Sequence, residues 1–146
     1  MRAREGRALA TDLTARLAAL EAGAAAVAAR APARLAAELA RLKQAVAQLA
    51  AGVPVDEQRL AVEVALLADR VDITEELVRL RTHLAACRET LAGEGAVGKQ
   101  LGFLAQELLR EVNTIGSKAN DASVTQTVIA MKGELEKFRE QLENLE

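Results

Sequence analysis

Apolar residues recur at helical spacing along almost the whole chain, and no strand-like alternation of useful length is present. Two stripes open the sequence: Leu9, Leu13, Leu17 and Leu20, then Leu35, Leu39, Leu42, Val46 and Leu49. Intervals of three and four residues place each stripe on one face of a helix, because a turn takes 3.6 residues. They predict a helical segment over residues 4–50, in a unit of residues 1–52. Pro32 lies between the stripes and predicts a kink or a break, since proline has no N–H to donate.

The rest of the chain, residues 56–146, predicts further helices with clear start and stop signals. Asp56 is a plausible N-cap, a capping box starts at Asp72, and Asp121 can cap the last helix. Breaks are predicted at residues 51–54 and at 93–95, which contain glycine and proline. The last seam repeats at heptad spacing: Val124, Val128, Met131, Leu135, Phe138, Leu142 and Leu145. The sequence therefore predicts an all-α protein of long helical hairpins or a coiled-coil-like bundle, and its narrow seams favour a homo-oligomer.

Composition supports this prediction and limits the function. The 146 residues are 51% hydrophobic, 27% charged and only 1% aromatic, which is typical of long helices. A net charge of −2 gives no global basic field that would attract nucleic acid, and only Phe103 and Phe138 could stack on a base. Cys87, the single cysteine, excludes an intrachain disulfide and lies at a seam position. No apolar run reaches the ~18 residues of a membrane span, so we expect a cytoplasmic protein without membrane contact.

The stretch of residues 106–121 is unusually polar for a helix that also packs. Its apolar seam is Leu104, Leu108, Val112 and Ile115. One polar stripe is Glu107, Glu111, Thr114 and Lys118, and a second is Gln106, Arg110, Asn113 and Ser117. A helix that only packs does not need two dense polar faces. The stretch therefore predicts a surface that contacts a ligand.

Carboxylates and the only histidine form the candidate chemistry. Asp72, Glu76, Arg79 and His83 line one flank of the seam around Leu80. A carboxylate and an imidazole on one stripe can hold a divalent cation or act as general acid and base. The alternative is an ordinary salt-bridged flank beside a coiled-coil seam. Glu107 and Glu111, on adjacent turns, can bind Mg²⁺ or Mn²⁺ in a helical bundle, or form a solvated acidic face.

If these helices are neighbours, the two stripes make one acidic site. The catalytic and metal-binding candidates are then Glu76, His83, Glu107 and Glu111. The candidates for RNA phosphate contacts are Arg70, Arg79, Arg110, Asn113 and Lys118. Acids for a metal and cations for phosphates are what phosphodiester cleavage needs, although no named metal motif such as HExxH is present.

Three blocks of the sequence resemble the YicC/YloC family of bacterial proteins: residues 59–83, 97–121 and 134–146. The opening Arg4-Glu5-Gly6, followed by Leu9, is similar to the start of the helical half of the family. The resemblance implies a metal-dependent endoribonuclease that acts on RNA rather than DNA in the bacterial cytoplasm, assembled as a ring-like homo-oligomer. It also implies that residues 56–146 are the helical signature domain, and that the N-terminal domain of the family is absent from this chain.

The chain departs from the family at two positions of one helix face. Family members usually carry an acidic residue where this chain has Gly102, and asparagine where it has Leu109. Both lie on the face of Gln106 and Asn113, whereas the face of Glu107 and Glu111 is intact. If the altered face contributes to RNA binding, activity is expected to be reduced. Two other functions stay open: a non-catalytic helical oligomerisation module, and an RNA-binding adaptor that does not cleave.

Overall fold

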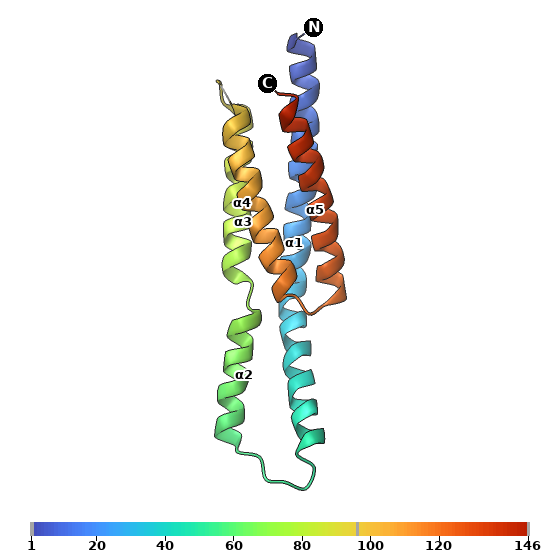
Figure 1. The fold of residues 1–146 in the computed structure, drawn as a ribbon, viewed down its shortest axis with the longest axis vertical. Helices are drawn as coiled ribbons and strands as arrows, with labels where there is room; N and C mark the ends of the chain where they lie inside the picture. Colours follow the sequence, from blue (N-terminus) through green and yellow to red (C-terminus); the bar gives the residue numbers. More distant parts are fainter. Residues whose placement is uncertain (1, 96, 146) are drawn as a thin grey trace.

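The computed structural model describes residues 2–95 and 97–145, without the side chains of Arg2 and Ala3, and these residues form helices joined by short loops. The helices are α1 (Arg2–Leu49), α2 (Glu57–Val71), α3 (Thr74–Ala92), α4 (Val97–Lys118) and α5 (Ala122–Glu143) (Figure 1). No strand occurs within the described ranges. The all-α prediction is confirmed.

Asp56 and Asp121 cap the starts of α2 and α5, as the sequence predicts, whereas the capping box predicted at Asp72 does not form, because the N-cap of α3 is Ile73 and it makes no side-chain cap hydrogen bond. The side chain of Asp56 accepts hydrogen bonds from the backbone N–H groups of Gln58 and Arg59, and Asp121 accepts one from Val124. These bonds satisfy amides that have no partner within the first turn of a helix. Pro32 does not break α1, which continues through it as one helix. Proline inside a helix costs about 3 kcal/mol, through a lost backbone hydrogen bond and a clash of its ring, whereas the many alanines around Pro32 favour the helix.

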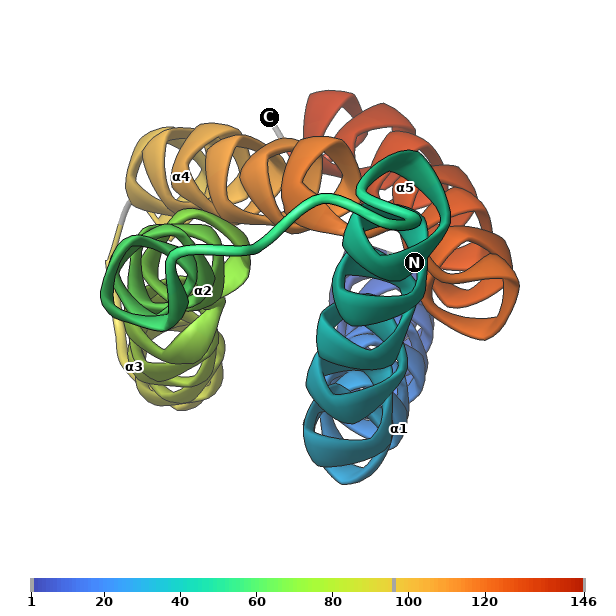
Figure 2. The same ribbon diagram turned by 90° about the horizontal axis from the view of Figure 1, so that it is seen from below.

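Four helices, α1, α3, α4 and α5, surround one hydrophobic core. Helix α3 packs on α4, α4 on α5, α5 on α1 and α1 on α3, so the four close into a ring (Figure 2). The core contains residues of all four helices, among them Leu17, Leu80, Leu108 and Phe138. Cys87 is fully buried in this core, and burial raises the pKa of its thiol to about 12. A thiol that stays protonated fits the predicted role of a small core residue rather than a nucleophile.

The first and the last helix pair along the bundle. Arg16 Nη1 lies 3.0 Å from Glu134 Oε2, and Gln141 Nε2 donates to Asp12 Oδ2 at 3.0 Å. The beginning of α1 and the end of α5 therefore lie at the same end of the molecule (Figure 1).

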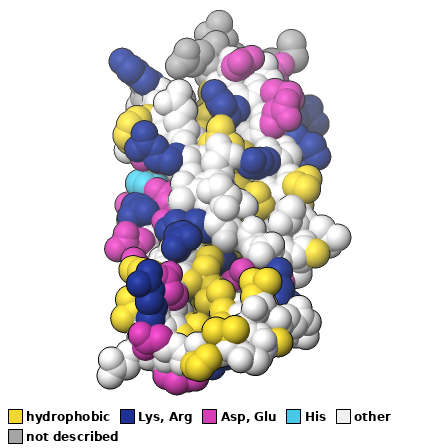
Figure 3. All heavy atoms as spheres, turned by 60° about the horizontal axis from the view of Figure 1, so that its bottom comes forward, with side chains coloured by type: hydrophobic (Ala, Val, Ile, Leu, Met, Phe, Trp, Pro, Cys, Tyr) yellow, Lys and Arg dark blue, Asp and Glu magenta, His cyan; other side chains and the backbone are white. Residues whose placement is uncertain are grey.

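The second half of α1 extends beyond the bundle and pairs with α2, and we call this pair the arm. The arm seam is only half-buried and comprises Leu35, Leu39, Leu42, Val46, Leu60, Val64 and Leu67. Leu49 is 89% exposed at the end of the arm, and Val62 and Leu66 are more than half exposed. Figure 3 shows hydrophobic side chains gathered at this end of the molecule. Within the described ranges, no helix is both long and apolar enough to cross a membrane.

Arg34 fixes the base of the arm to the bundle. Its side chain is buried, with 3% of the residue exposed, and it donates to the backbone oxygens of Val71 and Lys118. Val71 ends α2 and Lys118 ends α4, so one guanidinium joins three helices. A positive charge is favoured there because carbonyl groups at a helix C-terminus carry partial negative charge.

Candidate active site between α3 and α4

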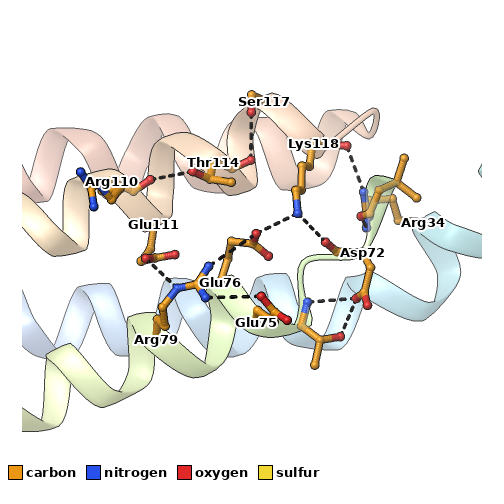
Figure 4. Close-up of polar contacts among 12 residues, drawn as sticks. Arg34, Asp72, Glu75, Glu76, Arg79, Arg110, Glu111, Thr114, Ser117 and Lys118 are labelled. Atoms are coloured by element: carbon orange, nitrogen blue, oxygen red, sulfur yellow. Dashed lines mark hydrogen bonds and ion pairs between the residues drawn. The ribbon is translucent and has the colours of Figure 1, made fainter. Parts of the chain in front are cut away.

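The polar flanks of α3 and α4 face each other and form a network of ion pairs. Arg79 Nε of α3 donates to Glu111 Oε1 of α4 at 2.9 Å, and Arg79 Nη2 lies 3.7 Å from Glu76 Oε1 (Figure 4). Arg79 also lies 3.5 Å from Glu75, one turn earlier on the same helix. These two helices are therefore neighbours, the condition on which a shared acidic site depended, and the two predicted stripes meet at Glu76 and Glu111.

Lys118 connects the last turn of α4 to the joint between α2 and α3. Its Nζ donates to Glu76 Oε1 at 2.8 Å and to the backbone oxygen of Asp72 at 3.0 Å (Figure 4). Asp72 in turn accepts hydrogen bonds from the backbone N–H and the hydroxyl of Thr74, which orders the first turn of α3. Residues 72 and 118 therefore hold the start of α3 against the end of α4.

Glu76 differs from the other acids of the network in having a buried carboxylate oxygen, Oε2, without a hydrogen-bond partner in the described structure. Only 6% of its side chain is exposed. Glu76 lines a hollow of about 270 Å³ together with Asp69, Asp72, Glu75 and Lys118. An unsatisfied carboxylate oxygen in such a place is costly to folding, and it marks a position where a ligand atom would be favourable.

The surrounding cations keep this carboxylate ionised. Burial by itself would raise the pKa of Glu76, but the hydrogen bond from Lys118 and the charges of Lys118 and Arg79 lower that pKa overall. The pKa of Asp72 is also lowered, first by its hydrogen bonds from Thr74 and then by the charges of Lys118 and Arg34. Two negative charges therefore persist at the α2–α3 joint at neutral pH.

These shifts predict that the fold loses stability in acid. A carboxylate whose pKa is lower in the folded chain stabilises it above the unfolded pKa, about 4.3 for glutamate, and this contribution is lost as the pH falls through the folded value. We expect the urea midpoint to fall from about pH 5 downward, and to fall less steeply in Glu76→Gln. Urea titrations at constant ionic strength between pH 7 and pH 3 measure this.

Glu89→Gln is the matched control, because Glu89 is an exposed acid of the same helix. It should keep the acid slope of the unchanged chain. An acid slope that is the same in Glu76→Gln and in the unchanged chain would contradict a lowered pKa at Glu76.

The other predicted site residues lie apart from this network. His83 is half-buried on α3, seven residues after Glu76, which is about 10 Å along the helix axis. Glu107 is half-buried on α4, one turn before Glu111. Three further side chains are exposed on α2 and α4: Arg70, Arg110 and Asn113.

The positions of the acidic and histidine side chains limit how the chain could bind a metal ion. In residues 2–95 and 97–145, no three acidic, histidine or cysteine side chains converge as ligands of one ion. Glu76, His83, Glu107 and Glu111 therefore do not fit a shared ion in this conformation. Asp69, Asp72, Glu75 and Glu76 line one hollow, and Mg²⁺ needs only one or two carboxylates, because it completes its shell with water and substrate phosphate oxygens.

Sequence reasoning missed three residues of this region. Asp69 lines the hollow from α2, the helix before the one that carries Glu76, and Glu75 lines it from a position beside the stripe of Glu76. Arg34 had a usable signal, because it continues the spacing of Ala24, Val27 and Ala31 on the core face of α1. An arginine at a seam position must bury its charge or find carbonyl partners, and Arg34 finds two.

The network lies within the part of the chain that matches a known protein family. The family model described as endoribonuclease YicC-like, C-terminal, matches residues 27–146, which include every residue of the network. The protein named probable endoribonuclease YicC of Clostridioides difficile is 43% identical over 70 residues, and so is the protein of that name of Haemophilus influenzae. Each of these matches covers 48% of this chain and 24% of the relative, so the aligned part spans about a quarter of the length of those relatives.

Proposed function

Because the chain belongs to the YicC-like endoribonuclease family, whose C-terminal domain it matches, we propose that it acts in the cleavage of RNA phosphodiester bonds. The proposal rests on one observation above all, the buried Glu76 carboxylate beside two cations. RNA cleavage needs groups that hold phosphate and groups that accept or donate protons, and the α3–α4 network offers both. We place this activity in the cytoplasm, and we expect single-stranded RNA to be the substrate.

Arg79 and Lys118 are the groups proposed to bind phosphate. Arg79 is 48% exposed and Lys118 is 31% exposed at their side chains, so both can reach a ligand while their carboxylate partners stay buried. A guanidinium can bind phosphate through two parallel hydrogen bonds, whereas the ammonium acts as a point charge. RNA phosphate would then replace part of the pairing of these cations with Glu76 and Glu111.

A divalent cation, Mg²⁺ or Mn²⁺, is part of the proposal. Glu76 would hold it with Asp72 or Glu75, the acids that line the same hollow. Such an ion supplies charge stabilisation at the phosphate and a more acidic water.

Chelator-sensitive cleavage tests the proposed function. The purified chain is incubated with labelled single-stranded RNA and Mg²⁺ or Mn²⁺, with and without EDTA, and products are separated on a denaturing gel. We expect internal cuts that EDTA abolishes and that added metal restores. Cleavage that persists in EDTA would contradict the metal dependence, and the absence of cleavage with either metal would contradict the activity of this chain.

A structural role is the second candidate, and two observations favour it. The acids of the network are already paired with cations, and the half-buried arm seam is typical of a chain that assembles into a homo-oligomer. The double substitution Glu107→Gln with Glu111→Gln separates the two functions. If RNA cleavage, metal binding and RNA binding are all unchanged in this variant, these two acids have only a structural role.

A further inference from the structure

The α4–α5 side of the bundle carries a hollow that the proposed active site does not use. Its volume is about 450 Å³, and it lies between the first turns of α4 and the last turns of α5. The lining residues are Lys99, Gly102, Phe103, Gln106, Arg139, Leu142 and Glu143. The first four share one stripe of α4, since they follow each other at intervals of three, one and three residues.

An exposed aromatic ring forms one wall of this hollow. Phe103 is 61% exposed, whereas Phe138 is fully buried, and the sequence contains neither tryptophan nor tyrosine. A large apolar ring that faces water contributes little to folding. It is, however, well suited to contact the flat face of a nucleobase.

Gly102 leaves the hollow open beside that ring. A methyl group built at Gly102 would meet no atom within 4 Å, so no packing requirement demands glycine there. Glycine within a helix costs about 1 kcal/mol relative to alanine, and its absence of a side chain lets a flat ligand approach the α4 backbone. Glycine at position 102 therefore enlarges the hollow.

The charges at the hollow favour an anionic ligand at one end. Lys99 and Arg139 line it against a single acid, Glu143, and Lys99 lies in the first turn of α4, where the helix dipole is positive. An adjoining hollow of about 410 Å³, toward the start of α5, has three acids, Glu136, Glu140 and Glu143, against the two cations Lys132 and Arg139, so it favours phosphate less. A phosphate chain is therefore favoured at the Lys99 end.

We propose that this hollow is a nucleotide subsite for single-stranded RNA, in which a base stacks on Phe103 and Lys99 and Arg139 bind the flanking phosphates. Gln106 is placed to hydrogen-bond a base edge, because it follows Phe103 by three residues on the same stripe. The subsite rests on the proposed function in one respect, that RNA is the ligand. It lies on the α5 side of α4, away from the α3 side that carries Glu111 and its pairing with Arg79.

Tryptophan fluorescence tests the stacking directly, because the natural chain contains no tryptophan or tyrosine that would add to the signal. The probe is single-stranded oligoadenylate RNA in EDTA, so that no cleavage occurs. We expect the oligonucleotide to quench the tryptophan emission of Phe103→Trp. Ile129→Trp is the matched control, since Ile129 is 64% exposed on α5 and does not line the hollow. Its emission should change little.

Two further variants strengthen the test. Phe103→Ala should raise the Kd for oligoadenylate about tenfold, as expected for one lost stacked base. Adding Gly102→Leu to Phe103→Trp should fill the hollow and abolish quenching, and circular dichroism should show a fold at least as stable, because leucine favours helix over glycine.

Several results would overturn the subsite. Equal quenching in Phe103→Trp and Ile129→Trp, or quenching by inorganic polyphosphate alone, would show that stacking at position 103 is not involved. A shift of the emission of Phe103→Trp with protein concentration in the absence of RNA would assign the hollow to a second copy of the chain. Loss of quenching in a chain that still cleaves RNA rejects the subsite alone, whereas quenching without cleavage rejects only the proposed activity.

Discussion

Phe138→Ala is expected to lower the free energy of unfolding by about 3–5 kcal/mol, the range measured for large aromatic side chains removed from cores. Phe138 is the largest of the fully buried side chains in the described structure. Its removal loses the free energy gained when the ring is transferred from water into the core. It also leaves a cavity that the neighbouring helices cannot close completely. Urea unfolding followed by circular dichroism at neutral pH measures the loss.

The two phenylalanines of the chain make this test internally controlled. Phe103→Ala removes the same ring from a position that is 61% exposed, and it should change the stability by no more than about 0.5 kcal/mol. If Phe138→Ala does not fold at all, Phe138→Leu keeps the test quantitative with a smaller loss. Equal losses for the two alanine variants would contradict the packing described for α5.

Glu76→Gln is expected to lower the rate of RNA cleavage about 100-fold or more, the size of effect that a positioned acid–base or metal-holding carboxylate has. Glutamine keeps the shape of the side chain and removes its charge. The group that carries the proposal is the carboxylate of Glu76, a residue that lines the acidic hollow and whose buried Oε2 atom has no hydrogen-bond partner in the described structure. Initial cleavage rates at saturating Mg²⁺ or Mn²⁺ measure the effect.

Glu89→Gln, purified in the same way, is the control for this prediction and for contaminating nuclease. Glu89 is exposed near the end of α3 and is expected to leave cleavage unchanged. If Glu76→Gln loses stability but cleaves at the rate of the unchanged chain, the network serves only to hold α3 against α4. Cleavage activity that separates from the chain on a sizing column would instead point to a contaminating nuclease.

The sequence predicted the helices well because their signals are local. The break predicted at residues 93–95 separates α3 from α4, and Asp56 and Asp121 cap the helices that they were expected to cap. The partners of each helix were not predictable in the same way. All the helices have similar apolar seams, so the spacing of apolar residues does not predict which helices pack together. That α1 packs on both α3 and α5 is seen only in the structure. The stripe from Leu35 to Val46 has only α2 to cover it and stays half-buried, and Leu49 is exposed.

For the candidate site, the sequence predicted which face of a helix each residue occupies, but not which residues of neighbouring helices it contacts. Spacing placed Glu76 and Glu111 on stripes that could meet, and they do meet through Arg79. Spacing also placed His83 on the stripe of Glu76, although two turns of helix separate them along the axis. The pairing of Lys118 with Glu76 depends on how α4 is rotated against α3, which is decided by core packing and not by either helix alone.

The pairing of α1 with α5 has a consequence for the synthesis of the chain. The contacts of Arg16 with Glu134 and of Asp12 with Gln141 join residues that are 118 and 129 positions apart. A ribosome makes α1 first and α5 last, so the apolar stripe of α1 stays partly uncovered in the nascent chain until α5 has emerged. Closure of the core is therefore a late event, and a transcript that ends before residue 122 yields a polypeptide with an exposed leucine stripe that invites aggregation and proteolysis.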